Sequence, residues 1–308
     1  MIDIKHSVGR GFGTGGLYDI LKELQLFSAG IKGEVYFVEN NAGDDGNDGL
    51  SWDKAKKTLA AAITASNANI AAGSSGWAAR NTIFIKGDAI CEDLTVFPAK
   101  CDVIGAGSCD AINKTRIIGE HTETGDGVIQ STGWYNIEFK NDDASAIFTV
   151  TTYSGLYFGD CIFTADADAV NAILTSGSCD NFTIKNCWFR NDEDGNDPFA
   201  TCAISIAGAA YNMVIKNSFV QGDVGIKFAN ATTYNCRVDN CTIVATTLCL
   251  DDDSSLVVFT NNNFITAANG TTPNDVVDAN VKFGANNVLT DGTVGTISYP
   301  TLSDLTTA

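Results

Sequence analysis

A nine-residue pattern recurs between residues 155 and 264, and it constrains the fold more than any other feature. The segments align without gaps over their centres: GLYFGDCIF (155–163), NFTIKNCWF (181–189), NMVIKNSFV (212–220), NCRVDNCTI (235–243) and LVVFTNNNF (256–264). Another short apolar strand lies near each: AIFTV (146–150), AILTS (172–176), CAISI (202–206), VGIKF (224–228) and LCLDD (248–252). Each repeat therefore predicts a strand, a turn, a strand, a corner and a third strand.

The central residue of each repeat is polar, and we expect it to form the corner. These residues are Asp160, Asn186, Asn217, Asn240 and Asn261, separated by 26, 31, 23 and 21 residues. The unequal intervals indicate loops of variable length. Asn tolerates the left-handed conformation and hydrogen-bonds to backbone, so it suits a corner. In rungs stacked about 4.8 Å apart, we expect its side chains to bond to one another as a structural ladder.

Apolar residues alternate within each segment, as at Phe182 and Ile184, so one face of every strand points inward. The residue after the corner is small and forms an inward column, in which cysteine acts as a small hydrophobe. A column of metal-binding thiolates is disfavoured because the chain has only two histidines and no tight Cys/His spacing. The column comprises Cys161, Cys187, Ser218, Cys241 and Asn262.

Coils of this kind stack into a parallel β-solenoid. The pattern resembles the right-handed parallel β-helix of the pectin-lyase-like superfamily, including its asparagine ladder, over roughly residues 35–290. We therefore expect an all-β fold: a right-handed, single-stranded parallel β-helix with an N-terminal capping helix and a short non-solenoid arm. Earlier rungs are expected at 82–90, 94–107, 115–122 and 134–141.

The resemblance extends to the start of the solenoid. Many chains of that superfamily begin with a strand, a loop containing Asp-Gly and a helix with a Lys-Thr-Leu stretch, which here is Lys57–Leu59. We expect a helix at about 53–67, with Ser51 or Asp53 as its N-cap, to cover the exposed end of the first rung.

The acidic loop before this helix has two interpretations. Asp44, Asp45, Asn47 and Asp48 form a structural turn or, alternatively, bind calcium, because several carboxylates on a tight loop suit a hard cation. An EF-hand is excluded, since its twelfth position, counted from Asp44, is Ala55 rather than Glu. We expect no other cofactor.

Composition narrows the classes of partner. The 19 Lys and Arg against 37 Asp and Glu give a net charge of −18, which disfavours nucleic acid and anionic membranes. The N-terminus lacks the apolar core of a secretory signal, and no run approaches the roughly 20 apolar residues of a membrane span. We therefore expect folding in a reducing compartment, with most of the ten cysteines as free thiols.

The resemblance also implies a glycan-cleaving activity, but the sequence contains no complete catalytic set of either kind, neither the basic residue of a lyase beside acidic ligands nor the paired carboxylates of a hydrolase. The catalytic candidates are Asp251, Asp252 and Asp253, then Asp192 and Asp194 in the acidic stretch up to Asp197. Both clusters also fit solvated loop charge. A lyase would need a basic residue near the abstracted proton, but Arg237 is expected to face solvent.

Glycan binding without cleavage needs only exposed aromatic rings. The candidates are Trp134, Tyr135, Tyr153 and Tyr211, predicted to lie on loops. Trp188 and Phe219 fall at outward positions of their strands and could meet a sugar or a neighbouring subunit. The alternative for all of them is partial cover by neighbouring side chains.

The expected organisation is an arm at 1–34 with an amphipathic helix, a solenoid at 35–290 and a C-terminal tail or cap at 291–308. This outline resembles phage tailspikes and capsid-decorating proteins. It implies a virion structural protein that folds in the host cytoplasm, trimerises, contacts capsid or tail proteins through the arm, and binds surface glycan. The alternative is an extracellular polysaccharide lyase or glycoside hydrolase.

Overall fold

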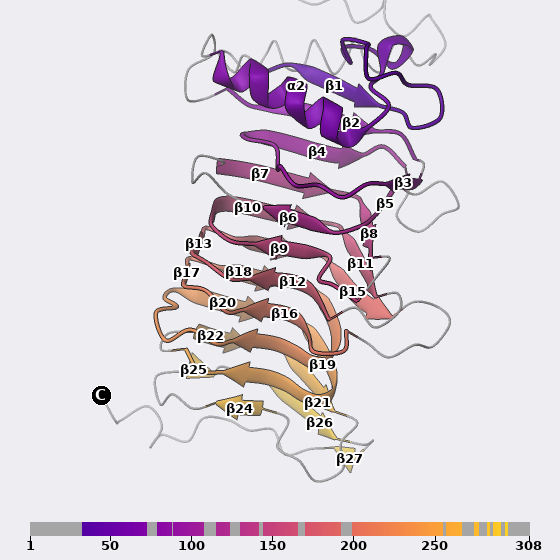
Figure 1. The fold of residues 1–308 in the computed structure, drawn as a ribbon. Helices are drawn as coiled ribbons and strands as arrows, with labels where there is room; N and C mark the ends of the chain where they lie inside the picture. Colours follow the sequence, from indigo (N-terminus) through magenta and orange to yellow (C-terminus); the bar gives the residue numbers. More distant parts are fainter. Residues whose placement is uncertain are drawn as a thin grey trace, which may run out of the picture.

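The computed structural model describes residues 33–72, 79–87, 89–107, 115–123, 130–141, 144–165, 170–191, 199–254, 257–266, 274–276, 282–283, 286–290 and 293–294. These residues form a parallel β-solenoid whose strands stack one rung above another (Figure 1). Nearly all of the predicted arm and tail lies outside the described residues. The right-handedness of the coil stays a prediction.

The first face of the solenoid is one continuous parallel sheet. Its strands, in order, are β1 (Val35–Val38), β2 (Asn81–Ile85), β4 (Cys101–Gly105), β7 (Gln130–Tyr135), β10 (Tyr153–Gly159), β14 (Thr183–Lys185), β18 (Val214–Lys216), β20 (Cys236–Asp239), β22 (Val257–Thr260) and β25 (Lys282–Phe283). Two short strands, β13 (Cys179–Asp180) and β17 (Ala210–Tyr211), extend its edge.

The second and third faces form one sheet because β19 (Phe219–Phe228) and β21 (Thr242–Asp252) belong to both. The second face contains β3 (Ala89–Cys91), β5 (Arg116–Ile118), β8 (Glu138–Lys140), β11 (Ile162–Ala165), β15 (Trp188–Asn191), β23 (Asn263–Thr266) and β26 (Asn287–Thr290). The third contains β6 (His121–Glu123), β9 (Phe148–Val150), β12 (Asn171–Thr175), β16 (Cys202–Ile206) and β24 (Asn274–Val276). Only the terminal β27 (Thr293–Val294) pairs antiparallel among the described strands.

Strand register confirms the predicted alignment of the repeats. Along the first face, Phe158 pairs with Ile184, Ile184 with Ile215, Ile215 with Val238, and Val238 with Phe259. All five side chains are buried in the core. The inward assignment of Ile184 is therefore correct, and each rung packs its apolar residues on the rungs beside it.

The predicted corner residues all adopt the left-handed conformation, with φ between 52° and 57°. Asn186 Nδ2 donates to Asp160 Oδ1 (3.1 Å), Asn217 Nδ2 to Asn186 Oδ1 (3.4 Å), and Asn240 Nδ2 to Asn217 Oδ1 (3.0 Å). Asn261 departs from this order because its amide donates to the carboxylate of Asp239 (3.2 Å). A charged acceptor is preferred over an amide oxygen.

Two features of the corners were not predicted. Asn136, with φ 56°, forms an earlier corner of the same kind. A second ladder occurs where the chain enters the first face: Asn212 donates to Asn181 (3.3 Å) and Asn235 to Asn212 (3.4 Å). All three of these asparagines also have positive φ.

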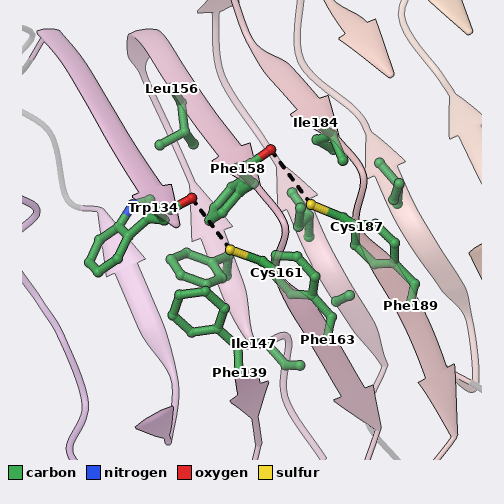
Figure 2. Packing of buried hydrophobic residues seen from close by; sticks show 14 of the residues in the cluster. Trp134, Phe139, Ile147, Leu156, Phe158, Cys161, Phe163, Ile184, Cys187 and Phe189 are labelled. Atoms are coloured by element: carbon green, nitrogen blue, oxygen red, sulfur yellow. Dashed lines mark hydrogen bonds between the residues drawn. The ribbon is translucent and has the colours of Figure 1, made fainter. Parts of the chain in front are cut away.

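The small residues after the corner are buried, as predicted. The thiol of Cys161 donates to the Trp134 carbonyl (3.4 Å) and that of Cys187 to the Phe158 carbonyl (3.5 Å), as Figure 2 shows. Asn262 Oδ1 accepts from the amide of Cys241 (2.9 Å), so polar members of the column are satisfied by backbone. The nine cysteines that the structure describes are free thiols, which agrees with the prediction.

The capping helix α2 spans Leu59–Ala71 rather than 53–67, and it lies against β1 and β2 at the N-terminal end of the stack (Figure 1). Its N-cap is Thr58, whose Oγ1 accepts from Ala61 N (3.2 Å), and not Ser51 or Asp53. Residues Trp52–Lys54 form a separate 3-10 helix. The start is delayed because Asp45 accepts from the amides of Lys57 and Thr58 (2.9 and 2.8 Å) and holds them in place.

Candidate functional site

The three successive acids at the end of β21 do not form a common surface site. Asp251 points outward and pairs with Lys227. Asp252 occupies the inward position next to Phe228 and is fully buried, with Oδ1 accepting from Ser254 N (2.8 Å). Asp253 is exposed. The interpretation of this run as a surface cluster is therefore wrong for Asp252, whose strand register turns it into the core.

The second acidic candidate region lies outside the described residues. It includes Asp192 and Asp194 and extends to Asp197. Its catalytic role stays a prediction.

The acidic loop before α2 uses its side chains to close itself. Asp44 accepts from Gly46 N (2.8 Å), Asp48 accepts from Leu50 N (2.9 Å), and Asn47 donates to Ala55 O (3.0 Å). Asp45 holds the start of the helix. Within the described ranges, no three His, Cys, Asp or Glu side chains gather closely enough to share a metal ion. The turn interpretation accounts for these contacts, and calcium binding stays a prediction.

Two of the predicted sugar-binding aromatics lie in the core. Trp134 is completely buried, paired with Val103 and Phe158 at an inward position of the first face. Tyr153 is 3% exposed, and its hydroxyl donates to Thr132 Oγ1. Neither residue lies on a loop, so the prediction that they stack on sugars is wrong.

Tyr135 lies on the outer side of β7 and is half-buried. Its ring packs against Tyr157 of β10, with 5.2 Å between centroids and 31° between planes. Burial and the neighbouring Asp102 carboxylate raise the pKa of the Tyr135 phenol to about 12. This pair therefore presents neutral phenols at ordinary pH.

Tyr211 and Tyr234 form a second pair at the edge of the first face, which we call the tyrosine platform. The two residues are bridged in parallel on successive rungs, and their rings stack with centroids 5.7 Å apart and planes 25° apart. They are 36% and 37% exposed. Each is followed by an asparagine of the second ladder, Asn212 or Asn235, so the platform borders exposed amides.

A third pair lies on the second face. Trp188 is 55% exposed, the largest exposure among the large apolar side chains of the described chain, and its ring is 6.0 Å from that of Phe219. Both point outward, as predicted, and they pair directly across β15 and β19. The buried Ile162 lies beside Trp188 on the preceding rung.

Sequence reasoning missed Tyr157 and Tyr234, which complete two of the pairs. A signal exists for Tyr234 but not for Tyr157, which is followed by Phe158. Tyr-Asn dipeptides occur at 135–136, 211–212 and 234–235, and each asparagine is a left-handed corner. The dipeptide therefore places tyrosine at the last position before a corner, where equivalent residues of successive rungs can stack.

Comparison of the chain with protein-family models, with curated proteins and with solved structures found no match. Any inference about function therefore rests on the sequence and the geometry of this chain. Among the described residues, no helix has the length and apolar character required to cross a membrane.

Proposed function

We propose that this protein is a glycan-binding structural solenoid of a virion surface, and that the tyrosine platform holds the glycan. The observation that carries the proposal is the exposed, nearly parallel stack of Tyr211 and Tyr234 along the solenoid axis. Flat aromatic faces bind the apolar faces of sugar rings, and tyrosine combines an apolar ring with a polar tip.

The amides beside the platform suit sugar hydroxyl groups. Asn212 and Asn235 each donate one amide hydrogen bond along the ladder. An amide nitrogen carries two hydrogens, so each side chain keeps a second donor. Both asparagines are exposed. The platform and the second ladder together therefore offer stacking and directional hydrogen bonding, a combination that suits a neutral sugar.

Binding is favoured over cleavage by the state of two of the catalytic candidates, Asp251 and Asp252. A glycoside hydrolase needs two carboxyl groups that flank the glycosidic bond. Asp251 is held by Lys227, and Asp252 is buried below the sheet. These contacts support a binding role, while a lyase or hydrolase remains the competing proposal.

The virion location and the assembly also form part of the proposal. They are supported by the outline of the chain, in which a solenoid follows a non-repeating arm, as in the phage proteins it resembles. A trimer with side-by-side solenoids would cover Trp188, a large apolar group that is 55% exposed, together with the half-buried Phe219. Light scattering of the full chain tests this: we expect a trimer, and a monomer for Trp188→Glu. An unchanged oligomer in that variant would remove Trp188 from the interface.

Glycan-array binding followed by titration calorimetry tests the platform. Tyr234→Ala should weaken binding by about tenfold or more, because one of two stacked rings is lost. Tyr234→Phe keeps the ring and should retain most of the affinity. Because both side chains are partly exposed, we expect thermal stability to change little. Equal affinity of wild type and Tyr234→Ala for every bound glycan would overturn the proposal.

A further inference from the structure

Two lysines occupy adjacent outward positions on the first face. Lys185 of β14 pairs directly with Lys216 of β18, and Gly159 of β10 pairs with Lys185 on the other side. Neighbouring strands are about 4.8 Å apart, so the two side chains start one strand spacing apart. Like charges directly opposite each other in a sheet are destabilising.

The two ammonium groups are not held by a salt bridge in the described part of the chain. Neither lysine makes an ion pair or a side-chain hydrogen bond there. Asp239 follows Lys216 in the same column, but its carboxylate accepts from Thr260 Oγ1 (2.6 Å) and Asn261 Nδ2 (3.2 Å). Arg237 also pairs with it (3.1 Å). In a chain with 37 acidic residues and 19 basic ones, two adjacent unpaired lysines are an exception that packing does not explain.

The two preceding rungs, β7 and β10, carry the Tyr135–Tyr157 pair, which lies flat on the sheet. A Cβ atom added to Gly133 would lie 2.4 Å from Tyr135 Cε2, and one added to Gly159 would lie 2.6 Å from Tyr157 Cε1. Glycine at these two positions is therefore what lets the rings lie on the backbone. The Tyr135 phenol hydrogen-bonds to Asp102, which Arg80 Nε holds at 2.7 Å.

The outer surface of β7, β10, β14 and β18 thus presents two flat rings and then two lysines without a salt bridge. Tyr135 lies in the same column as the lysines, and Tyr157 lies two residues before that column on β10. We call Tyr135, Tyr157, Lys185 and Lys216 the tyrosine–lysine strip. We propose that this strip binds an acidic polysaccharide that runs parallel to the solenoid axis. Sugar faces would stack on the tyrosines, and carboxylate or sulfate groups would pair with the lysines.

The charge and the shape of the strip favour an acidic polysaccharide over other ligands. The strip offers local positive charge on a molecule of net charge −18, so it complements an isolated anionic group on a sugar better than a densely charged nucleic-acid backbone. Neighbouring rungs are about 4.8 Å apart, so an extended chain that runs along the solenoid axis would pass over successive rungs and meet each of these side chains. The inference rests on the proposed glycan-binding role but uses residues separate from the tyrosine platform.

Binding of the full-length chain to three related polymers tests the strip: dextran, carboxymethyl dextran and dextran sulfate. Affinity electrophoresis should show binding to at least one of the two anionic polymers and weaker binding to dextran. The carboxymethyl and sulfate forms distinguish the two kinds of anion. The double variant Lys185→Gln/Lys216→Gln should lose about tenfold or more in that affinity, without a lower melting temperature, because a repulsive pair is removed.

The matched control is Lys54→Gln/Lys57→Gln, which removes two exposed lysines near the capping helix and gives the same change in net charge. It should bind like wild type. Equal losses in the two double variants would mean non-specific charge attraction and would overturn the inference. Absence of binding to both anionic polymers would overturn it too. So would binding to single-stranded DNA that is stronger than binding to the anionic polymers. Self-association of the protein that Lys185→Gln/Lys216→Gln abolishes and the control variant does not would likewise overturn it.

The experiments distinguish failure of the tyrosine platform from failure of the tyrosine–lysine strip. If Tyr234→Ala has no effect on any glycan while Lys185→Gln/Lys216→Gln loses the anionic polymers, the platform is wrong and the strip is right. The reverse result would remove the strip alone.

Discussion

Two columns of the first face, one residue apart along every strand, differ in how much their residues vary from rung to rung. The inward column keeps one chemistry from rung to rung: Phe158, Ile184, Ile215, Val238 and Phe259. The outward column beside it changes at nearly every rung: Gly159, Lys185, Lys216, Asp239 and Thr260. Stacking therefore dictates the inward residues, whereas the outward residues are available for binding.

The largest expected effect on stability comes from placing a charged side chain in the inward column. Ile184→Asp places an unpaired charge in the stacked core and should lower the free energy of unfolding by about 3–5 kcal/mol. Lys185→Asp, one residue further on, faces solvent beside Lys216 and should change it by less than about 0.5 kcal/mol. Urea unfolding measures both. Similar losses in the two variants would contradict the register and the comparison built on it.

Alkaline pH should destabilise the inward columns specifically. Burial raises the pKa of Cys202 and Cys249 to about 12 and that of Cys236 and Cys241 to about 11, from an ordinary value of 9.0. Above about pH 9 the unfolded chain loses these protons while the folded chain keeps them. Stability is thus full below that pH and falls as the pH rises toward 11, by up to about 1.4 kcal/mol per pH unit for each thiol.

Urea unfolding at a series of pH values between about 8 and about 10.5 measures this slope. Cys202→Ala should make the slope shallower, because one buried thiol is removed. Cys91 is exposed, so Cys91→Ala is the matched control and should leave the slope unchanged. A slope unaffected by Cys202→Ala would show that this thiol meets water in the folded protein.

A smaller effect is expected at the corners, which lie between the two environments. Asn217 has φ 52°, donates to Asn186 and accepts from Asn240. Asn217→Ala strains the left-handed backbone and breaks both bonds, so we expect a loss of about 1–2 kcal/mol. Asn217→Gly relieves the backbone and should lose about half as much. If glycine and alanine cost the same in thermal unfolding, the conformational role of asparagine here would be refuted.

Most of the fold followed from the repeat, and the errors arose where the alignment was not extended far enough. WYNIEF (134–139) aligns with FGDCIF (158–163), which would have placed Trp134 at the inward position of Phe158. Likewise, LCLDD aligns with VGIKF, which places Asp252 at the inward position of Phe228. Both residues were assigned to loops from their chemistry, although the period of two along a strand already fixed their direction.

The pairing of surface residues was harder to predict. Tyr211 meets Tyr234 only because the intervening loops bring equivalent positions of two rungs together, and loop length varies from rung to rung. The start of α2 depends on Asp45, which is 13 residues away from the amide of Thr58 that it holds. Contacts of this kind depend on loop geometry, which local sequence patterns do not specify.

The most direct test of the binding role measures two things together: whether the protein retains a glycan, and whether that glycan keeps its chain length. The full-length protein is incubated with size-defined neutral and acidic oligosaccharides, and bound and free fractions are analysed by mass spectrometry. The account predicts that some oligosaccharides are retained and that every chain keeps its length. Shortened chains would contradict it and would direct attention to Asp251 and Lys227 on the third face, while the absence of any retained glycan would contradict the binding role itself.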